Sequence, residues 1–228
     1  MNIKKTVIAT MLGLSAISAN VQAEQFTVQI ENLTNGIYFT PLLVAAHDSS
    51  TKLFQTGTSA NASLEAMAEG GDISGLVADI AGTSPATVEN PAAGLLAPGA
   101  NTTTSMLDTD GTANDYLSIV AMMLPTNDGF VGLNSWEIPS AAGTYTFTIN
   151  GYDAGTEAND ELTTSIPAPI DFGTGTGGTG VATSDSNTNV HIHRGSIGDD
   201  NSTGGISDLD NSVHRWLNPI ARITVVVQ

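Results

Sequence analysis

Three carboxylates in two short stretches of the chain have the residue types and spacing of a site for a hard cation. Asp128 precedes the sequence Gly-Phe-Val-Gly, and Asp153 and Glu157 enclose an Ala-Gly-Thr turn further along the chain. Calcium takes about six to eight oxygen ligands from carboxylates, carbonyls and water, and it tolerates irregular geometry. Gly155 can adopt any unusual φ angle that this turn requires. The pattern therefore predicts a calcium site where two strands pass into loops.

The segments around these carboxylates have the patterns of short β-strands. Alternating apolar residues predict half-buried strands at 26–31 and 145–149. The continuous apolar run at 116–124 predicts a central strand that is covered on both faces. Further strands are predicted at 38–46 and at 219–227.

One helical insertion is expected between the second predicted strand and the central strand. Pro41 in the second strand indicates an edge or a bulge. Residues 59–69 have a helical composition and stop at Gly70-Gly71, which is typical of a helix C-cap. Residues 72–80 are expected to add one helical turn, and residues 81–100 to form a loop. Several short strands with one short inserted helix predict an all-β, antiparallel sandwich.

Four ordered pieces of the sequence resemble the spondin N-terminal domain. Residues 125–132 resemble its Pro-x-x-Asp-x-Phe/Trp stretch, and residues 152–157 resemble its Tyr/Trp-Asp-Ala-Gly-Thr-Asp stretch. Residues 219–225 resemble the Pro-x-Ala-Arg-Val strand that closes these domains, and residues 62–71 resemble a short helix found early in them.

This resemblance implies a C2-like antiparallel β-sandwich that binds a calcium ion. The metal-binding carboxylates of the family match Asp128, Asp153 and Glu157. Animal members usually have Asp at the position of Glu157, whose side chain is one methylene longer. Animal members also have cysteines, whereas this chain has none, so no disulfide is implied.

The first 23 residues have the pattern of a secretory signal peptide. A basic start at residues 2–5 is followed by a short apolar run at 7–17 and by a small-residue cleavage site at 21–23. The apolar run is too short to cross a bilayer, and no later segment is long enough. We therefore expect cleavage after Ala23, one domain over residues 24–228, and a secreted or periplasmic protein without membrane insertion.

The composition excludes a role in nucleic-acid binding. The chain has a formal net charge of −17, and the expected mature part has Lys52, Arg194, Arg215 and Arg222 as its only basic residues. Binding of phosphate backbones needs clustered Lys or Arg, and an acidic surface favours divalent cations or basic partners instead. The acidic, Lys-poor composition is typical of a secreted bacterial protein.

His191-Ile192-His193 offers a second, different metal site. Two imidazoles on one face of an extended segment can bind zinc or copper, and several Asp residues and His214 lie nearby in the sequence. The alternative is a strand whose histidines are bonded to backbone carbonyls or carboxylates. An exported transition-metal-binding protein therefore remains the alternative function.

Other motifs point to no chemistry of their own. Gly173-x-Gly175-x-x-Gly178 matches a dinucleotide fingerprint but lacks the strand before it and the helix after it. No Gly-x-Ser-x-Gly or His-Glu-x-x-His sequence is present, so a secreted hydrolase is the weaker alternative and no enzyme is expected. Asp108 and Asp110 stand in an Asp-Thr-Asp-Gly sequence that predicts a β-turn, from which either could still reach the ion.

The sequence as a whole predicts an exported, calcium-binding module for adhesion or matrix interaction. Asp128, Asp153 and Glu157 would hold Ca²⁺, and the ion would neutralise and join loops that otherwise repel one another. The expected partner is a protein or a glycan at the cell surface or in a matrix.

Overall fold

The computed structural model describes residues 25–167, 181–183, 186–201 and 204–228. The predicted signal peptide at 1–23 and the glycine-rich segment at 173–180 lie outside the described residues. Neither described α-helix has the length and apolarity that crossing a membrane requires. The strands are β1 (Gln25–Asn32), β2 (Tyr38–Phe39), β3 (Leu43–His47), β4 (Ala86–Glu89), β5 (Asn101–Thr103), β6 (Leu107–Asp108), β7 (Tyr116–Leu124), β8 (Gly129–Glu137), β9 (Gly143–Asp153), β10 (His191–Ile192) and β11 (Ala221–Val227); the helices are α1 (Ala62–Gly70), α2 (Ser74–Ile80) and the 3₁₀ turn η1 (Ala81–Thr83).

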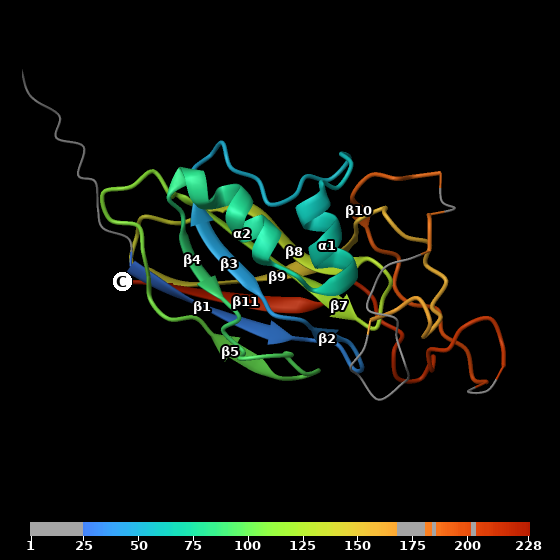
Figure 1. Ribbon diagram of the computed structural model, residues 1–228. Coiled ribbons are helices and arrows are strands. Elements are labelled where there is room, and N and C mark those ends of the chain that lie inside the picture. The colour runs from blue at the N-terminus through green and yellow to red at the C-terminus, as the bar shows by residue number, and fades with distance from the viewer. Residues whose placement is uncertain (1–24, 168–180, 184–185, 202–203) are drawn as a thin grey trace, which may run out of the picture.

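The strands pair antiparallel in the order β4-β3-β7-β8-β9-β11-β1-β5 (Figure 1). The long strand β9 belongs to both halves of this sheet. Its residues 143–149 pair with β11, and its residues 150–153 pair with β8. The sheet therefore folds over at β9 into two facing layers, which confirms the predicted all-β antiparallel architecture.

The first core lies between the two layers. The alternating residues Phe26, Val28 and Ile30 of β1 are fully buried there, together with Ile223 and Val225 of β11. Each large apolar side chain removed from water contributes about 1.5–3 kcal/mol to folding. The alternation in the sequence thus reports the inner face of this layer.

The second core lies between the outer face of β3, β7 and β8 and the two α-helices, which cover that face in Figure 1. Leu64 and Met67 of α1 and Leu76 of α2 pack there against Val120 and Met122 of β7. Because the remaining residues of β7 alternate into the first core, this strand is buried on both faces. Its continuous apolar run is thereby explained, and the predicted central strand is confirmed.

The ends of α1 follow from its sequence. The side chain of Asn61 accepts a hydrogen bond from the backbone N–H of Leu64 at 2.8 Å, which caps the first turn. Gly71 ends the helix in a left-handed conformation with φ of 72°, and its N–H donates to Met67 O. The predicted stop at Gly70-Gly71 is confirmed.

Two predicted segments differ from the structure. The strand expected at 38–46 is divided into β2 and β3 by residues 40–42, which include Pro41. The loop expected at 81–100 contains η1 and the edge strand β4, whose residues are only half-buried. The helical turn expected at 72–80 is confirmed as α2, so the helical insertion consists of α1 and α2.

Candidate functional site

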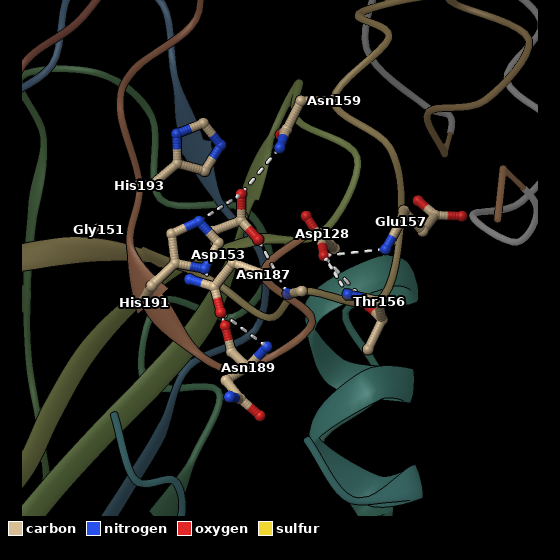
Figure 2. A network of polar contacts seen from close by, with 12 residues as sticks. Asp128, Gly151, Asp153, Thr156, Glu157, Asn159, Asn187, Asn189, His191 and His193 are labelled. Carbon is tan, nitrogen blue, oxygen red and sulfur yellow. Dashed lines mark hydrogen bonds and ion pairs between the residues drawn. The ribbon is translucent and has the colours of Figure 1, made fainter. Parts of the chain in front are cut away.

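Asp128 and Asp153 lie side by side at the open end of the β8–β9 hairpin, away from its turn (Figure 2). Asp128 directly precedes β8 and Asp153 ends β9, and the first residue of β8, Gly129, is paired with Asp153. The backbone N–H of Ala154 also donates to Asp128 O at 3.2 Å. Asp128 and Asp153 are 0% and 2% exposed, so the hairpin places two carboxylates together inside the protein.

The two oxygens of Asp128 have different surroundings. Oδ2 accepts hydrogen bonds from Thr156 N at 2.8 Å, from Thr156 Oγ1 at 3.2 Å and from Glu157 N at 3.1 Å. Oδ1 is buried and has no hydrogen-bond partner within the described parts of the chain. One oxygen therefore anchors the loop after β9, and the other is available to a ligand.

Burial raises the pKa of the Asp128 carboxyl above its ordinary value, and the negative charge of Asp153 adds a smaller rise. The backbone N–H groups of Glu157 and Thr156 oppose that rise. A buried carboxylate beside another carboxylate favours either protonation or a bound cation.

Asp153 is held by its own loop and by β10. Its Oδ1 accepts from Gly155 N at 2.8 Å, and its Oδ2 accepts from Asn159 Nδ2 at 2.8 Å. Oδ2 also lies 3.6 Å from Nε2 of His191. These contacts fix the direction in which the carboxylate points.

Gly155 provides the backbone conformation that the sequence predicts for this turn. Its φ angle is 74°, in the left-handed region that favours glycine. A Cβ atom at this position would lie 2.7 Å from the carbonyl carbon of Thr188 and 3.0 Å from the backbone of Asn189. The turn therefore requires glycine both for its conformation and for the close approach of the loop before β10.

We expect Gly155→Ala to lower the free energy of unfolding by about 2–4 kcal/mol, because left-handed strain and a backbone clash add together. Gly57→Ala is the matched control, since Gly57 has φ of 83° but nothing within 4 Å of the added Cβ. The control should cost only about 1–2 kcal/mol. Urea denaturation of both variants measures the difference, and equal losses would show that the close approach to Thr188 has no energetic weight.

Glu157 is not brought to the other two carboxylates. Its side chain is buried, and its Oε1 accepts from Val181 N at 3.3 Å. Figure 2 shows its carboxylate directed away from Asp128 and Asp153, although its backbone N–H is bound to Asp128. Among the described residues, no three His, Asp or Glu side chains already converge as metal ligands. The structure thus brings together two of the three predicted ligands.

The two histidines of the second predicted site belong to the same cluster. β10 pairs with β9 so that His191 stands opposite Asp153, and His193 N donates to Gly151 O at 3.1 Å. The charge of Asp128 also acts on the His193 ring. Carboxylates and histidines that are distant in sequence therefore surround one place in the fold.

Hydrogen bonds assign opposite tautomers to the two imidazole rings. Nδ1 of His191 lies 2.8 Å from the carbonyl oxygen of Asn189, so Nδ1 carries the proton and Nε2 keeps its lone pair. His193 accepts from Gly195 N at Nδ1, at 2.9 Å, so its proton is on the buried Nε2. Burial lowers the pKa of His193 to about 4, so this ring is neutral at pH 7. Only His191 has the tautomer that a metal ion needs at Nε2.

Glu69 is a neighbour that the sequence did not single out. It is 6% exposed at the C-terminal end of α1, where burial raises its pKa and the charge of Asp128 adds to this rise. The signal in the sequence is a charged residue directly before the Gly70-Gly71 stop of an otherwise core-facing turn. Its presence increases the negative charge around Asp128.

Several predicted alternatives lie elsewhere or have structural roles. Asp108 is paired with Gln25 at the start of β1, the end that lies away from Asp128 and Asp153. Thr112 N donates to Thr109 O in the predicted turn. Neither Asp108 nor Asp110 reaches the cluster. The two tryptophans also have structural roles, because Trp216 is 6% exposed in the first core and Trp136 packs in a tilted arrangement against Phe147, with ring centroids 4.7 Å apart.

A serine–histidine pair exists, but it is sealed inside the protein. His47 Nε2 lies 2.7 Å from Ser118 Oγ, and His47 Nδ1 lies 2.8 Å from the carbonyl oxygen of Asp48. Both side chains are 0% exposed, and Ser118 Oγ also accepts from Ser135 N at 2.9 Å. The pair ties β3 to β7 and β8, and no substrate can reach it in this conformation.

The comparison with known families agrees with the motifs around the hairpin end. The family model described as Spondin_N matches residues 19–189, which include both stretches that carry the carboxylates. The match ends before His191 and before the closing strand β11. A search of curated proteins gave no match.

Proposed function

Because the chain belongs to the spondin N-terminal family, whose members are extracellular, matrix-type interaction modules, we propose that it is an exported adhesion module organised by calcium. Asp128 and Asp153 would hold the ion. Glu157, whose backbone is already bound to Asp128, remains the third ligand that the family motif predicts. A bound calcium ion would supply positive charge and would fix the loop before β8 and the loop after β9.

The observation that carries this proposal is the buried Oδ1 of Asp128, which has no partner among the described residues and lies next to Asp153. Two buried carboxylates repel each other and lose their hydration, which costs several kcal/mol unless a cation is present. The basic side chain within ion-pair distance of Asp153 among the described residues is His191, whose Nε2 lies 3.6 Å from Oδ2. An oxygen-rich donor set of this kind suits calcium better than a transition metal.

The tautomer of His193 favours calcium over the two-histidine alternative. A protonated Nε2 cannot donate a lone pair, so His191 and His193 do not form a two-imidazole site in this arrangement. Zinc or copper binding that depends on both histidines would require the ring of His193 to change its hydrogen bonding.

Titration calorimetry with calcium and magnesium tests the ion. We expect calcium to bind and to raise the melting temperature, since a ligand of the native state stabilises it, by about 2.7 kcal/mol at a hundredfold excess over Kd. Magnesium should bind more weakly because it demands a tight octahedron. Glu157→Asp should weaken calcium binding without abolishing it, and Asp153→Asn should remove most of the thermal shift.

Asp110→Asn is the control for Asp153→Asn, because it removes the same charge from an exposed turn at the opposite end. A parent protein that melts identically with calcium and with chelator would contradict the calcium site. Zinc or copper in the purified protein, lost in His191→Ala, would support the alternative.

Export gives a separate prediction. We expect the exported protein to begin at Glu24, because Val21 and Ala23 are the small residues that frame the cleavage site. Intact-mass spectrometry of protein recovered from the periplasm and the medium measures the start of the chain and its location together. Retention of residues 1–23 would contradict the exported function, whatever the outcome for calcium.

A further inference from the structure

A cleft of about 310 Å³ opens beside the carboxylate cluster. It lies between the segment that follows β10 and the segment that precedes β11, and Asp153 and His193 form the wall that it shares with the cluster. Gly195 holds these segments together, because it has φ of 90° and a Cβ atom there would meet the carbonyl oxygen of Trp216. The cleft is therefore formed by backbone segments in close contact.

Two arginines line this cleft, together with the carboxylates of Asp153 and Glu161. Arg194 and Arg215 line it and are exposed, and they are two of the four basic residues that follow the predicted leader. Of the other two, Arg222 pairs with Glu31 at 2.7 Å and Lys52 donates to Ser135 at 3.0 Å. Arg215 makes no ion pair with any described residue. In a chain of net charge −17, this cleft presents the guanidinium group of Arg215 to an anionic group.

The carboxylates that line the same cleft are already bound by the protein. Glu161 accepts from Ile197 N at 2.6 Å with Oε1, and from Gly198 N at 2.8 Å with Oε2. Ser207 Oγ also donates to Glu161 Oε2 at 2.7 Å. Asp153 is held by its own turn and by Asn159. These carboxylates fix the loops that form the cleft, and their oxygens are not aimed at Arg215 within ion-pair distance.

Apolar side chains flank the arginines. Ile197 is 70% exposed and Leu217 is 76% exposed, and both line the cleft. Trp216 lies beneath them with its Nε1 donating to Ser196 Oγ at 3.2 Å. Exposed large apolar residues that adjoin one another beside an exposed arginine are typical of surfaces that bind a partner.

We propose that this cleft binds an acidic side chain of a partner protein, with an adjacent apolar residue of the partner packed on Ile197 and Leu217. Arg215 supplies the charged hydrogen bonds, since guanidinium recognises carboxylate with two parallel N–H groups. An acidic glycan is disfavoured because its repeated charges would be repelled by the rest of this acidic surface. The proposal names the partner chemistry of the interaction module proposed above, and it rests on that function.

Selection from a phage library of random heptapeptides, performed with calcium present, tests the cleft. Peptides enriched on the parent protein should carry Asp or Glu beside a large apolar residue. Synthetic copies, measured by fluorescence anisotropy, should bind Arg215→Gln at least about tenfold more weakly than the parent, as expected for a lost charged hydrogen bond. Replacing the acidic residue of the peptide by its amide should have the same effect.

Lys52→Gln is the matched control, because it removes one positive charge from an exposed side chain outside the cleft. It should leave peptide affinity unchanged, and Leu217→Ser should weaken binding a few-fold. Enriched peptides without an acidic residue, equal affinity for Arg215→Gln, or no enrichment at all would overturn the proposal. Stronger Arg215-dependent binding of a heparin oligosaccharide would overturn it too, in favour of a glycan.

The same titrations in chelator separate this proposal from the calcium site. Peptide binding that depends on Arg215 in both buffers would support the cleft independently of the calcium site. Equal peptide affinities with and without calcium would count against the calcium site but not against the cleft. The reason is that Asp153 lines the cleft, so a bound ion should strengthen the binding of acidic ligands.

Discussion

Replacing Asp128 with alanine should lower the free energy of unfolding by about 2–4 kcal/mol and should abolish calcium binding. The reason for the first effect is that Oδ2 of Asp128 accepts the N–H groups of Thr156 and Glu157 inside the protein. Each buried donor left without an acceptor costs about 1–3 kcal/mol. The second effect follows because the substitution removes the buried Oδ1, the oxygen that is proposed to bind the ion.

Asp128→Asn separates these two roles. The amide oxygen can still accept from Thr156 and Glu157, but the negative charge is gone. Because burial and Asp153 disfavour the charged form of Asp128, as its raised pKa shows, the asparagine variant should be at least as stable as the parent in chelator. It should nevertheless gain no stability from calcium.

Urea denaturation of the parent, the alanine variant and the asparagine variant, each with calcium and with chelator, gives the six values required. An asparagine variant that is stabilised by calcium as much as the parent would contradict the role of Asp128 as a ligand. An alanine variant as stable as the asparagine variant in chelator would instead contradict the anchoring of the loop by Oδ2.

The layers of the fold could be predicted because their residues repeat with the period of a strand. Phe26, Val28 and Ile30 face the first core as the alternation indicated, and 116–124 is buried on both faces as its continuous apolar run indicated. The edge strands could not be predicted, because β4 and β5 are short and only partly buried. Their positions depend on pairing with β3 and β1, which are remote in sequence.

The candidate site was predictable only where local sequence determines its geometry. Gly155 marks a tight turn, and this turn places Asp153 next to Asp128 once β8 and β9 form a hairpin. The approach of His191 to Asp153 depends on the pairing of a two-residue strand with β9. A strand of two residues is too short to show an alternating pattern in the sequence. The carboxylates and the histidines therefore appeared as two separate sites.

The direction of Glu157 also lies beyond what spacing can determine. Its place in the motif predicts a ligand, whereas its buried carboxylate is turned toward Val181 in the structure. The direction of a side chain is set by its packing, and the segment that packs on Glu157 lies more than twenty residues further along the chain.

Phe130→Ala should cause the second large loss, about 3–5 kcal/mol, because it empties the centre of the second core. Phe130 is 0% exposed and contacts two rings, Phe54 edge-on at 5.1 Å and Tyr152 stacked at 5.6 Å between centroids. The phenyl ring of Phe54 in turn lies against Gly132, where a Cβ would be 2.7 Å from it, so no neighbour can expand into the space without moving β8.

The same substitution should weaken calcium binding although Phe130 has no ligand atom. It lies two residues after Asp128 and is paired with Tyr152, directly before Asp153, so its ring fixes the two strand ends that carry the carboxylates. Phe147→Ala is the control on β9, since Phe147 is only half-buried and is paired with β11 instead of β8. It should cost less and should leave the calcium affinity unchanged.

Denaturation and calorimetry on both phenylalanine variants distinguish packing from site geometry. If Phe130→Ala lost stability but bound calcium like the parent, the carboxylates would be positioned by their hydrogen bonds alone. If it lost both, the aromatic core under the hairpin would be part of what holds the site, and the position of Phe130 in the family motif would have a physical reason.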